Sequence, residues 1–269
     1  MSSVLLEKSK RKENKYEKDS FLILLTLVAI SLVCLCGCTK ENVVLDETKA
    51  YQIENQISSL DIKLNAADFK IEKGDAFLVE SNLKYLSVSE KNGVLTIVDN
   101  AKSNSSYTDA TLTLYVPSGI IFDSIDIETG AAKMNVDTLS ANTIELVLGA
   151  GNVQIEALNV FSSANIKGGT GKINVVSGII NNLDIEVGAG KLDLTAKLLG
   201  DSEFEFGVGE SNITLVGSRE EYKVDIEKGI GSITIDGSVV TGTSSIGNGS
   251  NCIDIEGGVG AINLKFQAN

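Results

Sequence analysis

The chain contains no histidine and no tryptophan, and proline occurs once among its 269 residues. Without histidine, the sequence lacks the side chain most used for acid–base catalysis and metal binding near neutral pH. Its 8 Phe and 6 Tyr residues provide few rings for stacking on sugars or bases. These absences argue against histidine-based catalysis, and we expect no catalytic residues, no cofactor and no metal site.

Cysteine is scarce and unevenly placed. Cys34, Cys36 and Cys38 lie close together near the N-terminus, and Cys252 stands alone in the rest of the chain. A disulfide framework is therefore excluded for the mature chain if Cys38 is lipidated. We interpret Cys252 as a small, half-buried residue at the start of a strand.

Positive charge is in the minority. After residue 37 the chain carries 17 basic and 32 acidic side chains, a formal charge of −15. Proteins that bind nucleic acids present clustered Lys and Arg to the phosphates. The composition therefore excludes nucleic acid as the expected partner.

Repetition is the dominant feature of the chain. Seven copies of one pattern lie between Ile125 and Leu264, each an alternating apolar run, a Gly-x-Gly corner and a second alternating run. The last residue of the corner is Ala132, Gly151, Gly171, Gly190, Gly209, Gly231 and Gly260, in steps of 19, 20, 19, 19, 22 and 29 residues. Repeats of about 20 residues are typical of solenoids, whose units bury their apolar faces against their neighbours.

Apolar positions of period two on both sides of the corner indicate two strands in each repeat. We therefore predict an all-β fold, a parallel β-helix or β-roll solenoid over residues 57–269, in which each repeat is strand, corner, strand. A degenerate copy, Leu60 to Ile71, is expected to start and cap the stack. Three further alternating runs between Phe77 and Val116, with Asn92-Gly93 as a turn, predict extra coils or a small continuous sheet.

Stacking in register would align polar residues into three outward columns. Two columns are mainly acidic: Asp126, Glu145, Asn165, Asp184, Glu203, Asp225 and Asp254, and Glu128, Val147, Lys167, Glu186, Glu205, Glu227 and Glu256. We interpret both as a solvated face on which mutual repulsion raises several carboxylate pKa values. A Ca²⁺-binding roll would need Asp two residues after the last glycine, where this chain has Val153 or Ile173.

The third column is rich in amides: Asn135, Gln154, Asn174, Asp193, Asn212, Thr234 and Asn263. We expect these side chains to hydrogen-bond along the column, and they also offer contacts to a glycan.

The N-terminus has the layout of an export signal. A basic lead over residues 1–20 precedes the apolar run Phe21 to Cys36, and Leu35-Cys36-Gly37-Cys38 resembles a bacterial lipobox with Cys38 as the lipidated residue. An uncleaved membrane anchor is the alternative. We divide the chain into a signal peptide or anchor (1–37), a linker (38–56) and the repeat body (57–269). Either reading places the body outside the membrane that anchors it.

The segments LTLYVPSG, SIDIETGA and DIEVGAGKLDL resemble the DUF4097 proteins, a bacterial family of β-solenoid envelope proteins classed as candidate adhesins. The resemblance extends from Ile57 to Phe266. It implies cell-surface adhesion and supplies no catalytic residues.

Three functional hypotheses follow. The first is a membrane-tethered, non-catalytic module that binds a surface polymer or protein through its long faces. The second is a regulatory or structural envelope protein with a membrane-protein partner. The third is a polysaccharide-acting enzyme, against which stands the absence of any acid–base cluster that interrupts the repeats. The insertion Val239 to Asn251 is the segment we expect to make specific contacts.

Overall fold

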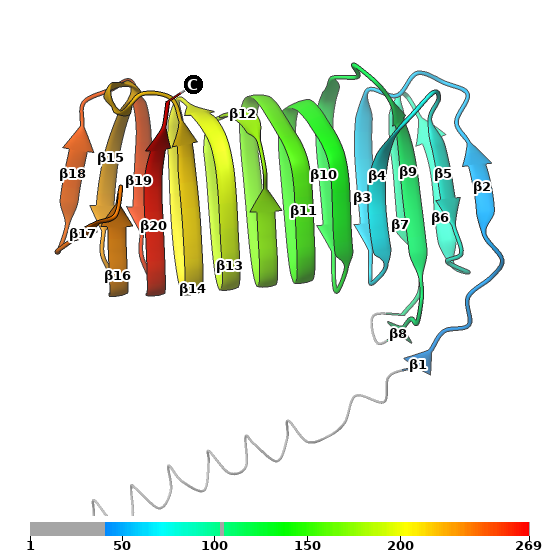
Figure 1. The fold of residues 1–269 in the computed structure, drawn as a ribbon. Coiled ribbons are helices and arrows are strands. Elements are labelled where there is room, and N and C mark those ends of the chain that lie inside the picture. The colour runs from blue at the N-terminus through cyan, green and yellow to red at the C-terminus, as the bar shows by residue number, and fades with distance from the viewer. Residues whose placement is uncertain (1–40, 103–104, 269) are drawn as a thin grey trace, which may run out of the picture. The chain divides into compact units, whose positions relative to one another are not determined.

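The computed structural model describes residues 41–102 and 105–268 (Figure 1). Within them the fold is all-β, as predicted, and its one helical turn is the 3₁₀ helix η1 (Arg219–Glu221). None of the described helices is long and apolar enough to cross a membrane. The apolar run Phe21 to Cys36 and the lipidation candidate Cys38 lie outside the described residues.

The central repeats stack as parallel coils, each beside the next in chain order. They comprise β10 (Phe122–Thr129), β11 (Lys133–Val175), β12 (Gly178–Asn181), β13 (Leu183–Leu199) and β14 (Asp201–Val216). Equivalent positions pair directly, as in Ile125 with Ile144 and Ile185 with Phe204. The register predicted from the alternation is therefore confirmed.

The coils contain a third strand segment that the sequence pattern did not predict. It pairs Val160 with Ile180 and Ile180 with Leu198. The predicted unit of two strands was therefore incomplete. In the first repeats the alternation of buried and exposed residues is interrupted between the second and third segments. Val136 and Leu139, for example, are both buried although they are three residues apart. A period of two therefore does not continue through the bend between these segments.

Chain order and spatial order differ at the C-terminal end. The seventh copy, β19 (Asn251–Glu256) with β20 (Val259–Gln267), lies between the fifth copy and the sixth, which is β15 (Tyr222–Glu227) with β16 (Ile230–Ile235) (Figure 1). Phe204 pairs with Ile255, and Ile253 pairs with Val224. The last copy thus enters the stack as its penultimate coil.

The polar insertion near residue 240 closes this end of the stack. Within it, β17 (Ser238–Val240) pairs antiparallel with β16, and β18 (Ser244–Gly247) pairs antiparallel with β15. The insertion Val239 to Asn251, in which we expect specific contacts, therefore forms strands over much of its length. The insertion caps the parallel strands of the sixth copy, which limits the exposed strand edge at that end.

The N-terminal end is built in the same way. The degenerate copy, β3 (Ser59–Leu64) with β4 (Asp68–Gly74), pairs on one side with β10 and β11 and on the other with β7 (Val94–Asp99) and β9 (Thr111–Pro117). It is an internal coil and does not start the stack, so that prediction was wrong. The prediction of extra coils or a small continuous sheet between Phe77 and Val116 is confirmed, because β7 and β9 add one coil to the stack.

Antiparallel strands also close this end: β6 (Leu86–Lys91) on β7, β5 (Leu78–Ser81) on β9, and β2 (Lys49–Gln52) on β5. β2 falls within the segment 38–56 that we assigned as a linker. Asn92 and Gly93, with φ of 53° and 79°, make the predicted turn between β6 and β7. The two-residue strands β1 (Glu41–Asn42) and β8 (Ser105–Ser106) complete the set.

Glycine is required at the corners because adjacent coils approach too closely for a side chain. A Cβ on Gly190 would collide with the carbonyl oxygen of Gly171, and one on Gly209 with that of Gly190. Gly209 also has a φ of +150°, a conformation that side chains with a Cβ rarely adopt. The corners therefore stack backbone on backbone, while the alternating residues Ile127, Ile185 and Phe204 fill the core.

Candidate binding surfaces

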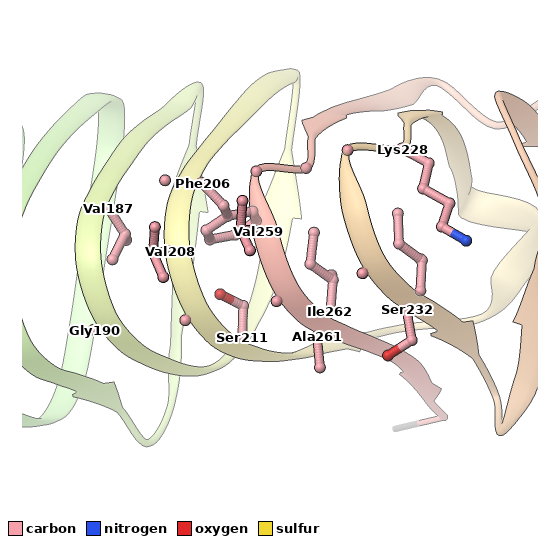
Figure 2. Close-up of a pocket in the computed structure, with 18 residues that line it drawn as sticks. Val187, Gly190, Phe206, Val208, Ser211, Lys228, Ser232, Val259, Ala261 and Ile262 are labelled. Carbon is pink, nitrogen blue, oxygen red and sulfur yellow. The ribbon is translucent and has the colours of Figure 1, made fainter. Parts of the chain in front are cut away.

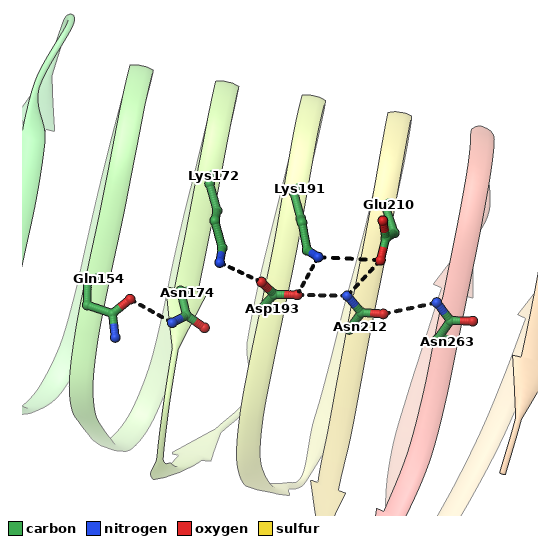
Figure 3. Close-up of polar contacts among 8 residues, drawn as sticks. All are labelled: Gln154, Lys172, Asn174, Lys191, Asp193, Glu210, Asn212 and Asn263. Atoms are coloured by element: carbon green, nitrogen blue, oxygen red, sulfur yellow. Dashed lines mark hydrogen bonds and ion pairs between the residues drawn. The ribbon is translucent and has the colours of Figure 1, made fainter. Parts of the chain in front are cut away.

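The amide column of the sequence forms a stacked row across six coils, of which Figure 3 shows all members except Thr234, and hydrogen bonds join its members in two runs. We call it the polar ladder; in spatial order it is Gln154, Asn174, Asp193, Asn212, Asn263 and Thr234. Asn174 Nδ2 donates to Gln154 Oε1 at 2.6 Å, Asn212 Nδ2 to Asp193 Oδ1 at 2.7 Å, and Asn263 Nδ2 to Asn212 Oδ1 at 2.9 Å. Thr234 Oγ1 donates to Asn263 Oδ1 at 2.8 Å. The predicted hydrogen bonding along the column is confirmed for these four pairs, whereas Asn174 and Asp193 lie side by side without such a bond.

Two lysines neutralise the acidic centre of the polar ladder. Lys172 Nζ lies 2.9 Å from Asp193 Oδ2, and Lys191 Nζ lies 3.4 Å from both Asp193 Oδ1 and Glu210 Oε1 (Figure 3). Burial alone would raise the pKa of Asp193, but the hydrogen bonds from Asn212 and Lys172 outweigh it and lower that pKa. Asp193 is therefore held as a carboxylate within a locally balanced row.

The two acidic columns are uninterrupted over the four coils at the C-terminal end of the stack. Four acids follow each other in each column, in the spatial orders Asp184, Glu203, Asp254, Asp225 and Glu186, Glu205, Glu256, Glu227. Local desolvation, followed by repulsion from Glu203, Glu256 and Glu186, raises the pKa of Glu205. The predicted rise in several of these pKa values is therefore found for Glu205, whereas the hydrogen bond with Lys223 lowers the pKa of Asp225. No group of three potential ligands that could hold a metal occurs within residues 41–102 and 105–268.

An apolar hollow of about 420 Å³ opens where two strands diverge. The pairing of β4 with β11 ends at Ile71 and Val136, after which β4 continues along β9 as far as Gly74. The hollow lies in the resulting wedge and includes Ile121 and Phe161, which are 57% and 52% exposed. At its rim, the Lys73 amide donates to Asp137 Oδ2 at 3.2 Å.

A column of exposed apolar residues runs along the corners. The middle residue of each Gly-x-Gly is Ala131, Ala150, Thr170, Ala189, Val208, Val259 and Ile230 in spatial order. The last three are exposed by 57%, 48% and 76%. Beneath this corner lies a small cavity of about 20 Å³, bordered by Phe206, Ser211 and Ile262 (Figure 2). Bulky Phe206 and small Ser211 come from the same strand, β14.

Cys252 is a half-buried free thiol one residue into β19, as predicted. The sequence therefore identified the polar ladder, the acidic columns and the setting of Cys252. It missed the hollow, because a period of two does not show where β4 leaves β11. The corner column was visible in the sequence as the variable residue of each Gly-x-Gly, which grows from Ala to Val and Ile toward the end of the stack.

The sequence matches the model of one protein family, described as the N-terminal domain of toast_rack, DUF2154, over residues 165–236. This stretch contains the third to sixth copies of the repeat and is less than half of the chain. The comparison thus indicates similarity to DUF2154 and not specifically to DUF4097. No curated protein matches the sequence.

Three solved structures align with most of this chain. A "putative adhesin" from Bacteroides fragilis is 14% identical, with 81% of this chain and 95% of that one covered and a TM-score of 0.48. A "putative cell adhesion protein" from Clostridium sporogenes is 18% identical, with 82% and 99% covered and a TM-score of 0.36. A "putative lipid binding protein" from Parabacteroides distasonis is 16% identical, with 83% and 99% covered and a TM-score of 0.42. Likeness at this level assigns no function.

Proposed function

We propose that this protein is a membrane-tethered, extracytoplasmic binding module of the bacterial envelope, without catalytic activity, and that its polar ladder recognises a hydroxyl-rich polymer. The observation that carries the proposal is the stacked row of amides, carboxylate and hydroxyl across six coils, which is hydrogen-bonded from Gln154 to Asn174 and from Asp193 through Asn212 and Asn263 to Thr234.

The polar ladder presents similar groups at a fixed interval on a rigid sheet. Neighbouring parallel strands lie about 4.8 Å apart, so a polymer that runs along the stack meets a new donor or acceptor at each coil. The amides of Asn174 and Asn263 each have one donor engaged along the ladder, and an amide has two N–H groups and a carbonyl oxygen. Many weak contacts of this kind add up through multivalency.

The charge of the body narrows the class of polymer. With 17 basic against 32 acidic side chains after residue 37, the body repels anionic chains and favours neutral or amine-bearing ones. We therefore propose a neutral or amino-sugar polysaccharide as the ligand class.

Affinity electrophoresis of the full-length protein tests this proposal. Gels would contain dextran, chitosan or alginate as neutral, cationic and anionic probes. We expect retardation by dextran or chitosan and none by alginate. The double variant Asn174→Ala/Asn263→Ala should lose the retardation, whereas Asn159→Ala, which removes a half-buried amide that donates to Ser140 on the third segment, should keep it. Equal loss in both variants, or no retardation at all, would contradict the proposal.

The tether is proposed on the sequence alone: Cys38 is lipidated after cleavage of residues 1–37, and the retained anchor is the alternative. Intact mass and detergent partitioning of wild type and Cys38→Ala separate the two. Loss of residues 1–37 with a gain of lipid mass supports the lipoprotein. A full-length, unmodified chain supports a retained helix and makes a membrane-protein partner the leading hypothesis.

A further inference from the structure

The exposed apolar column of the corners is most prominent over the last four coils. Ala189, Val208, Val259 and Ile230 pair in that order across β13, β14, β20 and β16. We call these four residues the corner strip. Figure 2 shows Val208 and Val259 on adjacent coils of the corner. The glycines on either side of each strip residue carry no side chain, so the strip stands above flat backbone.

One side of the corner strip is strongly acidic. Three residues before each strip position stand Glu186, Glu205, Glu256 and Glu227, all exposed and stacked in the same order. The pKa of Glu205 is raised, first by local desolvation and then by its acidic neighbours. A partner that brings positive charge would relieve this repulsion.

The other side of the strip carries little net charge. The positions that follow the corner glycines are Lys191, Glu210, Ala261 and Ser232, and the first two are paired at 3.4 Å. On the glutamate side, Lys228 follows Glu227 in the outermost repeat and is a positive charge among these acids. The charge around the corner strip is thus asymmetric: four glutamates lie on one side of its apolar residues, and the other side is nearly neutral.

An α-helix laid along the stack fits this spacing. Its apolar stripe returns about every 5.4 Å, one turn, and neighbouring coils are about 4.8 Å apart. The mismatch accumulates to only about 2 Å over four coils on these spacings. An extended strand in the same direction repeats each face about every 6.6 Å and loses register sooner.

We propose that the corner strip docks a basic amphipathic helix of a partner protein, with its apolar face on Val208, Val259 and Ile230 and its Lys or Arg residues toward the glutamate row. Charge complementarity selects this partner over a second copy of the chain, because a second copy has 17 basic against 32 acidic side chains after residue 37 and brings no excess of positive charge to the glutamate row. The site is separate from the polar ladder and does not depend on polysaccharide binding.

Fluorescence anisotropy with a labelled 18-residue Leu/Lys peptide, patterned as an amphipathic helix, tests the proposal on the full-length protein. Controls are a scrambled peptide of the same composition and a Leu/Glu helix. We expect the helical Leu/Lys peptide to bind at least 10-fold more tightly than either control. Val208→Ser/Val259→Ser should weaken binding about 10-fold, and Glu205→Gln/Glu256→Gln should weaken it and reduce its salt dependence.

Matched variants elsewhere on the surface keep the test specific. Val239→Ser removes an apolar side chain that is 69% exposed but belongs to the cap, and Glu128→Gln/Glu145→Gln removes two acids from the other end of the columns. Neither should change the affinity by more than twofold. Equal effects of strip and control variants, or equal binding of the scrambled peptide, would overturn the proposal. Concentration-dependent dimerisation in sedimentation, abolished by Val208→Ser/Val259→Ser, would overturn it in favour of self-association.

Discussion

Three single glycine substitutions separate the two reasons why the corners need glycine. Gly190→Ala introduces a collision with the carbonyl of Gly171 without a positive φ. Gly242→Ala, in the turn between β17 and β18, introduces a methyl group at a φ of +81° where no other atom lies within 4 Å. Gly209→Ala combines a φ of +150° with a collision against the carbonyl of Gly190.

The expected costs follow from these geometries. Backbone strain at a positive φ costs about 1–3 kcal/mol, and forcing backbone apart in a packed interior costs about 1–3 kcal/mol. We therefore expect losses of about 1 kcal/mol for Gly242→Ala, about 2 kcal/mol for Gly190→Ala and about 4 kcal/mol for Gly209→Ala in the free energy of unfolding. The collision cannot be relieved by a rotamer change, because the opposing atom is a backbone oxygen.

Urea denaturation followed by far-UV circular dichroism measures these losses, since the chain has no tryptophan to report by fluorescence. The m-value should stay constant in all three variants if only the folded state is affected. A Gly190→Ala variant as stable as wild type would refute the reasoning, because the corners would then have room for a Cβ.

Three further predictions concern charge and the core. Glu205→Gln should match or slightly exceed wild type in stability at pH 7, because a raised folded-state pKa means that ionisation of Glu205 disfavours folding. The difference in stability should vanish below about pH 4, where the carboxyl is protonated in both states. Thermal melts of the two proteins at both pH values measure this difference. The lowered pKa of Asp193 stabilises the fold at neutral pH, and this contribution is lost as the pH falls. Asp193→Asn should therefore lose less stability than wild type between about pH 5 and pH 2, and a parallel decline would contradict this. Ile185→Asp places an unpaired charge at a position that is 1% exposed and should unfold the adjoining coils, visible as loss of amide protection in hydrogen exchange; unchanged protection there would count against the core assignment.

The sequence predicted those parts of the structure that local patterns encode. Alternation defined the inward residues of the first two strand segments, and the Gly-x-Gly corners aligned the copies so that the polar ladder could be read in advance. Both succeed because stacking in register carries each sequence position into a spatial column.

The order of the coils could not be read from the same patterns. Each copy presents a similar surface to either neighbour. The pattern therefore does not show that the copy beginning at Ile253 lies between the copies beginning at Ser202 and Val224. The longer steps of 22 and 29 residues were the only signal, since the additional residues allow the chain to pass over a coil position and return. The hollow near Phe161 could not be predicted from the sequence, because it forms where the end of β4 pairs with β9 and no longer with β11.

Side-chain amide resonances offer the most direct test of polymer recognition by the polar ladder. In a ¹⁵N-labelled protein titrated with the polysaccharide that retards it, we predict shifts in the side-chain NH₂ signals of Asn174, Asn212 and Asn263. The signals of Asn159 and Asn181, on the third strand segment, should not move. Shifts confined to those two residues, or to the capping strands, would contradict the assignment of the binding face.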